Sequence, residues 1–140
     1  MATAVPYLFF PGNAAEAMDF YKGVFGAELH TMGFDAVTPE GETAPPGLMH
    51  SDLWTGEFRL FASDGMPGQP PSPFANPEIC ISAKSDEEGE VSNWFAALSE
   101  GAASVEPLEK MFWGDTFGKV TDKFGVQWMF NISAPAEAES

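Results

Sequence analysis

The stretch from Tyr7 to Gly26 decides the fold of this chain, and it is YLFFPGNAAEAMDFYKGVFG. Its first four residues are apolar and mostly aromatic, and a Pro-Gly pair stops them, which is typical of a short strand followed by a turn. Asn13 and Glu16 have the spacing of a capping box, in which two side chains satisfy backbone N–H groups of the first helical turn. Apolar residues then recur at helical spacing up to a glycine, so the pattern predicts a helix from about Ala14 to Phe25.

Three strands are predicted after this helix, and the whole order then repeats. A second capping box at Ser85 and Glu88 begins another helix, which Gly101 is predicted to end. The two predicted caps, Asn13 and Ser85, lie about 70 residues apart, and self-similarity at a fixed offset indicates duplication. The predicted strands cover residues 7–10, 27–32, 48–54, 58–62, 78–83, 104–108, 117–121 and 126–132.

The repeat predicts an α+β fold of two βαβββ modules within one domain at residues 1–132. Module one is expected at about residues 5–64 and module two at about residues 77–132, followed by a disordered acidic tail at residues 133–140. Neither half has enough strands to cover its own sheet. We therefore expect the halves to pair around a concave cleft, which is where small-molecule sites are usually found.

Two long connections rich in proline and glycine interrupt the pattern, at residues 34–47 and 63–75. Loops of this length in a compact domain are often lids or binding loops. In the second loop, Met66, Pro67 and Gly68 either close over the pocket or form a mobile connector.

The charge balance excludes several classes of partner. Six basic residues that do not cluster, against 21 acidic ones, leave a net charge of −15, which excludes nucleic-acid binding and disfavours an anionic membrane surface. The field favours cationic ligands, although acidic residues also simply keep a protein soluble. With one cysteine, Cys80, expected to be buried, and no apolar stretch of the ~18 residues that a membrane span needs, we expect a soluble cytoplasmic protein.

Several segments resemble known proteins. The stretch quoted above resembles the opening strand and helix of the vicinal-oxygen-chelate (glyoxalase/bleomycin-resistance/dioxygenase) superfamily. Phe112-Trp113-Gly114-Asp115 and the segment Val120–Trp128 are similar to its PhnB-like branch, whose members often carry the name demethylubiquinone methyltransferase. His50-Ser51-Asp52-Leu53 and Ser63-Asp64 also fit that branch, and the resemblance spans about residues 5–132. It implies a cup-shaped mixed sheet and a homodimer.

The resemblance also implies where a metal would bind. Metal-dependent members carry His or Glu ligands at four positions, which fall near Pro6, Leu60, Glu78 and Met129. Only Glu78 could ligate a cation, so the usual divalent centre is expected to be absent, and the chemistry that it supports would lose its main electrostatic term. The chain also lacks a Gly-rich strand–helix turn that would hold a methyl donor.

Other candidate residues come from the strand pattern and the resemblance. His50 and Asp52 share a strand face with Trp54, either as an oriented imidazole in a pocket or as a solvent-facing polar pair. Trp113 offers a stacking surface and an N–H donor at the cavity, or else is an ordinary core aromatic. By the resemblance, Leu60 and Met129 face the cavity, whereas His30 is expected at the surface.

These observations leave three hypotheses open. The first is a binding protein that holds a small molecule, cationic or aromatic, in an aromatic-lined pocket without a metal. The second is a metal-dependent lyase, isomerase or dioxygenase-type enzyme that uses Zn²⁺ or Mn²⁺ at a displaced site of His50, Asp52 and Glu78. The third is an interaction protein without a pocket. Whether the chain is an enzyme is not decided by its sequence.

Overall fold

The computed structural model describes residues 2–65 and 76–135, which form two compact units. Unit one is Met1–Asn76 and unit two is Pro77–Ser140. The elements of unit one are β1 (Tyr7–Phe9), α1 (Ala14–Phe25), β2 (Glu28–Gly33), the 3₁₀ turn η1 (Phe34–Val37), β3 (Leu48–Thr55) and β4 (Phe58–Ser63). Those of unit two are β5 (Ile79–Ala83), η2 (Ser85–Glu87), α2 (Glu88–Leu98), β6 (Ser104–Lys110), β7 (Thr116–Thr121) and β8 (Gln127–Ile132).

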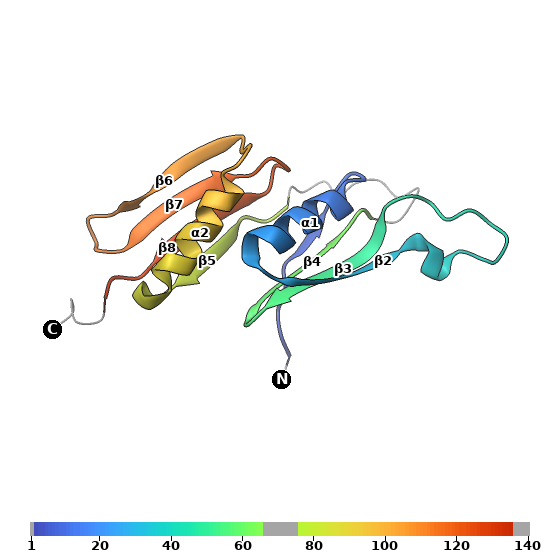
Figure 1. Cartoon of the computed structure of the whole chain (residues 1–140), viewed down its shortest axis with the longest axis horizontal. Helices are drawn as coiled ribbons and strands as arrows, with labels where there is room; N and C mark the ends of the chain where they lie inside the picture. The colour runs from blue at the N-terminus through green and yellow to red at the C-terminus, as the bar shows by residue number, and fades with distance from the viewer. Residues whose placement is uncertain (1, 66–75, 136–140) are drawn as a thin grey trace. The chain divides into compact units, whose positions relative to one another are not determined.

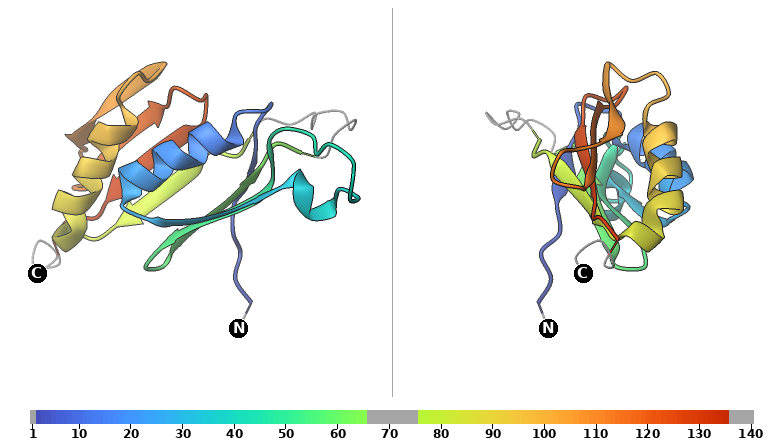
Figure 2. Two further views of the ribbon diagram at one scale, coloured as in Figure 1. Left: turned by 45° about the vertical axis from the view of Figure 1, so that its right-hand side comes forward. Right: turned by 90° about the vertical axis from the view of Figure 1, so that its left-hand side faces the viewer.

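The two units share one topology. Each has a four-stranded mixed sheet, in the order β1-β4-β3-β2 or β5-β8-β7-β6, whose first strand pairs parallel to its last. The other neighbours are antiparallel. Each helix lies across one face of its own sheet, as Figures 1 and 2 show. The predicted fold class of two βαβββ modules is confirmed.

Alternation along the strands separates a helix-covered face from an open face. In unit one the helix-covered face holds buried apolar side chains, and α1 covers them with Met18, Tyr21 and Phe25. In unit two, α2 contributes Val91, Phe95 and Leu98 in the same way. Burying one such side chain contributes about 1.5–3 kcal/mol, so these two layers supply the stability. The strand residues are Leu8, Leu53, Leu60 and Ala62 in unit one, and Ile79, Ile81, Val120, Trp128, Phe130 and Ile132 in unit two.

The first helix has the predicted bounds but not the predicted cap. Asn13 makes no side-chain capping hydrogen bond, and its buried Oδ1 has no partner among the described residues. The Asp64 carboxylate caps the helix instead, accepting the backbone N–H of Ala14 at 2.9 Å and that of Gly12 at 3.0 Å. The prediction is wrong because a carboxylate from the end of β4 reaches the orphan N–H groups first.

The second helix also starts differently from the prediction. A 3₁₀ turn precedes it, and the Glu87 carboxylate accepts the backbone N–H of Lys84 at 2.9 Å, in place of the predicted box of Ser85 and Glu88. The helix ends at Leu98, three residues before Gly101, whose positive φ of 69° belongs to the turn that follows.

Other predictions have mixed outcomes. Cys80 is exposed, not buried, because β5 directs Ile79 and Ile81 to the core and turns the residue between them outward. The loop of residues 34–47 contains η1, whose Phe34 is buried. Met66, Pro67 and Gly68 lie outside the described residues, as do residues 136–140 of the predicted tail. Among the described residues, no helix is long and apolar enough to cross a membrane.

Candidate functional site

The open face of unit one carries an aromatic cluster. Tyr7 and Phe9 project from β1, next to Phe61 of β4 and His50 of β3. The Tyr7 and Phe9 rings stack at 5.0 Å between centroids with 16° between their planes. Phe61 meets Tyr7 and His50 edge-on, at 5.8 and 5.0 Å. Phe9 is 51% exposed and Tyr7 36%, so the cluster presents ring faces and edges to solvent.

A hydrogen bond joins two of these rings. The Tyr7 hydroxyl lies 2.8 Å from Nδ1 of His50 and donates to it in the tautomer that carries its proton on Nε2. Partial burial raises the pKa of Tyr7 above its usual value, an effect that a hydrogen bond with Ser63 partly offsets. The pair thus places a neutral phenol next to an imidazole, beside the apolar rings of Phe9 and Phe61.

Asp52 lies on the same open face as His50, as their two-residue spacing predicts, but it does not orient the imidazole. Its carboxylate accepts two hydrogen bonds from Arg59, from Nε at 3.0 Å and from Nη2 at 2.5 Å. The Arg59 guanidinium also lies 5.4 Å from the centroid of the Phe61 ring. Asp52 is engaged this way because β4 brings a cation next to it, which the strand pattern of β3 alone cannot reveal. The interpretation in which the Asp52 carboxylate orients the His50 imidazole is therefore wrong.

Leu60 does not face the open side. It has no exposed surface and pairs in register with Leu53, on the face that α1 covers. The predicted orientation is wrong because adjacent strand residues point to opposite faces, so a one-residue error in a carried-over position reverses the side chain. The neighbouring residue on the open side is Phe61.

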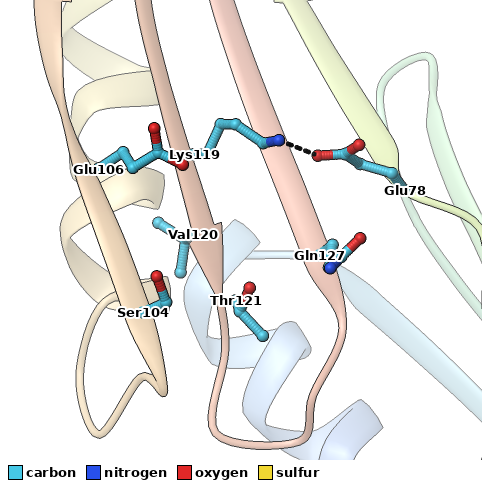
Figure 3. A pocket seen from close by; sticks show the side chains of 7 residues that line it. All are labelled: Glu78, Ser104, Glu106, Lys119, Val120, Thr121 and Gln127. Atoms are coloured by element: carbon cyan, nitrogen blue, oxygen red, sulfur yellow. Dashed lines mark ion pairs between the residues drawn. The ribbon is translucent and has the colours of Figure 1, made fainter.

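The open face of unit two is polar and holds a pocket of about 130 Å³ (Figure 3). Lys119 of β7 extends across this face, and its Nζ lies 3.2 Å from Oε2 of Glu78. Met129 lies on the open side, in register between Cys80 and Lys119, and its contact with a ligand stays a prediction. The pocket is lined by Glu78, Ser104, Glu106, Lys119, Val120, Thr121 and Gln127.

Trp113 lies in the turn between β6 and β7. It is 52% exposed and Phe112 is 98% exposed, and the two rings meet edge-on at 4.9 Å, so Trp113 is not a core residue of this unit. The Asp115 carboxylate anchors the turn by accepting from Asn131 Nδ2 at 3.1 Å and from the Ala134 N–H at 3.0 Å. These bonds, with a smaller contribution from Trp113, lower the pKa of Asp115. A ligand contact for Trp113 stays a prediction.

The residues present do not fit the divalent centre that the resemblance implies. Of the four implied positions, Leu60 is in the core and Met129 and Pro6 offer no hard ligand. Residues 2–65 and 76–135 contain no group of three or more His, Cys, Asp or Glu side chains placed to hold a metal ion. In the displaced set, His50 is bonded to Tyr7, Asp52 to Arg59 and Glu78 to Lys119. The displaced metal site of His50, Asp52 and Glu78 stays a prediction, because His50 and Asp52 belong to unit one and Glu78 belongs to unit two.

Comparisons with known proteins agree with this architecture. The family model described as 3-demethylubiquinone-9 3-methyltransferase matches residues 2–131. The chain belongs to this PhnB-like family. Protein YjdN of Escherichia coli is 31% identical over 139 residues, covering 91% of this chain and 92% of that protein. The crystal structure of PA1353 from Pseudomonas aeruginosa is 37% identical with a TM-score of 0.78, covering 96% of this chain and 99% of that one.

More distant structures share the fold of this PhnB-like chain. A bleomycin resistance determinant encoded on transposon Tn5 is 16% identical with a TM-score of 0.56, over 95% of this chain and 98% of that one. At that identity the likeness shows the fold alone. The resemblance stated from the sequence is thereby confirmed at the level of family and fold.

Sequence reasoning did not identify several residues of the two open faces. In unit one these are the aromatic residues Tyr7, Phe9 and Phe61 and the neighbouring cation Arg59. In unit two it is Lys119, which supplies the ammonium group of the pocket. A usable signal was present for the first two: if Leu8 is in the core, period-two alternation turns both neighbours to the other face. No comparable signal in the sequence marks Lys119.

Proposed function

We propose that this PhnB-like chain is a binding protein that holds a small organic molecule with an aromatic ring on the open face of unit one. The observation that carries the proposal is the stacked pair of Tyr7 and Phe9, which keeps large aromatic surface exposed on a sheet face. Clustered exposed aromatic rings of this kind are typical of binding surfaces, because their apolar area is stabilised when a partner covers it.

The polar groups around the cluster define what the ligand would carry. The Tyr7–His50 pair offers a hydroxyl and a ring nitrogen at the edge of the aromatic cluster. Beyond Phe61, the Asp52–Arg59 ion pair offers both charges, so a ligand with a donor or an acceptor can bind there. The net charge of −15 raises the local concentration of cations, which favours cationic over anionic aromatic compounds.

Isothermal titration calorimetry of the full chain against matched cationic, neutral and anionic aromatic compounds tests this function. We expect the cationic members to bind most tightly. Phe9→Ala should weaken binding roughly two- to tenfold, the range for loss of one aromatic pair contact. Phe20→Ala is the matched control, because Phe20 lies on α1, away from the open face, and loses the same ring. The absence of heat with every compound would contradict the proposal.

Two features belong to this proposal as expectations, a homodimer and a cytoplasmic location. Sedimentation of the purified chain would test the homodimer.

A further inference from the structure

The pocket of unit two is built differently from the aromatic face of unit one. It lies on the open side of β6, β7 and β8, and its side-chain lining consists of carboxylates, hydroxyls, an amide and one ammonium group (Figure 3). The side chain of its one apolar lining residue, Val120, is buried on the helix-covered face. The pocket therefore offers hydrogen bonds and charge but no surface on which a ring could stack.

The Lys119 side chain shows which charge the pocket accepts. Its ammonium group lies within the pocket, 3.2 Å from the Glu78 carboxylate. Glu106, on the neighbouring strand, is directly opposite Lys119 in the antiparallel register and forms no ion pair recorded among the described residues. The pocket lining thus holds two carboxylates and one ammonium group, a net charge of −1, and the ammonium group is turned toward Glu78.

We propose that this pocket is a second binding site, specific for a small primary amine that carries hydroxyl groups. The ligand's ammonium group would bind to Glu78, at the place that the Lys119 ammonium group now occupies, and the Glu106 carboxylate, which lines the same pocket, would add a longer-range attraction. Its hydroxyls would bond to Thr121 and Gln127 at the other end of the pocket. A volume of about 130 Å³ equals that of about four water molecules, which admits a three-carbon amino alcohol and little more.

Lys119 acts in this site as a tethered competitor. The side chains of Lys119 and Glu78 are 39% and 28% exposed, and ion pairs with that much solvent contact are weak. An incoming ammonium group can therefore displace Lys119, but part of its binding free energy is spent on doing so. Removing the Lys119 charge should tighten binding, whereas a site that used Lys119 to bind an anion would lose its ligand.

The test uses serinol (2-amino-1,3-propanediol) and glycerol, which share a three-carbon skeleton with two terminal hydroxyls and differ only at the central carbon, where serinol carries an ammonium group and glycerol a hydroxyl. Backbone amide resonances of the isotope-labelled full chain are followed during titration to millimolar concentrations, where molecules this small bind. We expect saturable shifts at the pocket with serinol and none with glycerol. Serinol has no aromatic ring, so failure here leaves the function proposed for unit one untouched, and the converse also holds.

Paired variants make the result decisive. Glu106→Gln should weaken serinol binding about two- to fivefold, while Glu109→Gln on the same strand, outside the pocket lining, should leave it nearly unchanged. Lys119→Gln should tighten binding by a similar factor, and Lys110→Gln, with the same change in net charge, should not. The proposal is overturned by equal shifts with both probes, by no shifts, or by weaker serinol binding in Lys119→Gln.

Discussion

The carboxylate of Asp64 accepts the backbone N–H of Ala14 at 2.9 Å, so a residue 50 positions downstream caps the first helix. The same carboxylate accepts the N–H of Gly12 at 3.0 Å and, through its other oxygen, that of Leu48 at 2.7 Å. It thereby joins the start of α1, the start of β3 and the end of β4. Gly47 makes room for it, because a Cβ there would lie 2.7 Å from Oδ2 of Asp64.

Replacing Asp64 by alanine should lower the free energy of unfolding by about 2–3 kcal/mol, because three backbone N–H groups lose a charged acceptor. Asn13→Ala is the comparison, since the sequence pattern would assign the cap to Asn13. Its effect should stay within about 0.5 kcal/mol, because the Asn13 side chain makes no capping bond. Urea unfolding of both variants measures this difference, and a larger loss in Asn13→Ala would contradict the assignment.

Two glycines should respond to alanine in opposite directions. A Cβ at Gly118 of β7 would lie 3.0 Å from side-chain atoms of Leu108 and Phe95 and 3.1 Å from the Glu106 carbonyl oxygen. Gly118→Ala should therefore destabilise the chain by about 1–3 kcal/mol through overpacking beneath α2. A Cβ at Gly23 in α1 would meet no atom within 4 Å outside the helix's own backbone, so Gly23→Ala should stabilise the chain by about 0.5–1 kcal/mol. Thermal unfolding compares the two, and the same sign for both would refute the packing argument.

The elements of the fold could be predicted because their signals are local. Gly26 adopts the predicted left-handed conformation, with φ 60°, and ends α1 after Phe25 as expected. The cap could not be predicted, because the donor Ala14 and the acceptor Asp64 meet only after β4 has joined the sheet. Local pattern therefore predicts where a helix ends better than which side chain satisfies its first turn.

The candidate site was harder to predict than the fold. The resemblance predicts that Leu60 faces the cavity, although the alternation of Arg59, Leu60, Phe61 and Ala62 already indicates a core residue. Cys80 was expected in the core because its neighbours are apolar, yet a strand with one covered face buries only every second residue. In both cases the two-residue period was a better guide than the run of apolar letters.

Alkaline pH should destabilise the chain in part through Tyr7. Burial raises its pKa above the usual 10.0, so below pH 10.0 both folded and unfolded chains keep the proton and the stability is complete. As the pH rises above this value the unfolded chain ionises first, and stability is lost. Tyr7→Phe should therefore show a shallower loss than the wild type. Identical slopes in Tyr7→Phe and the wild type would exclude this coupling.

Metal analysis addresses the displaced site. The chain purified without chelator should carry well under one equivalent of Zn²⁺ or Mn²⁺, because Asp52 is already engaged by Arg59 and His50 by Tyr7. His50→Ala should leave the content unchanged. Wild-type chain that retains a full equivalent after desalting, and loses it in His50→Ala, would instead favour a metal-dependent enzyme.

Because neighbouring residues of each strand point to opposite faces, one face of a strand must preserve the fold while the other face can change its surface chemistry. Leu60 and Phe130 are under pressure to preserve a stable fold, whereas Phe61 and Met129, one position away, can change with little loss of stability. The duplicated halves could in this way diverge into a ring-rich surface and a charged one while keeping the same scaffold. Engineering new selectivity into this chain should therefore start at the outward positions of β4 and β8.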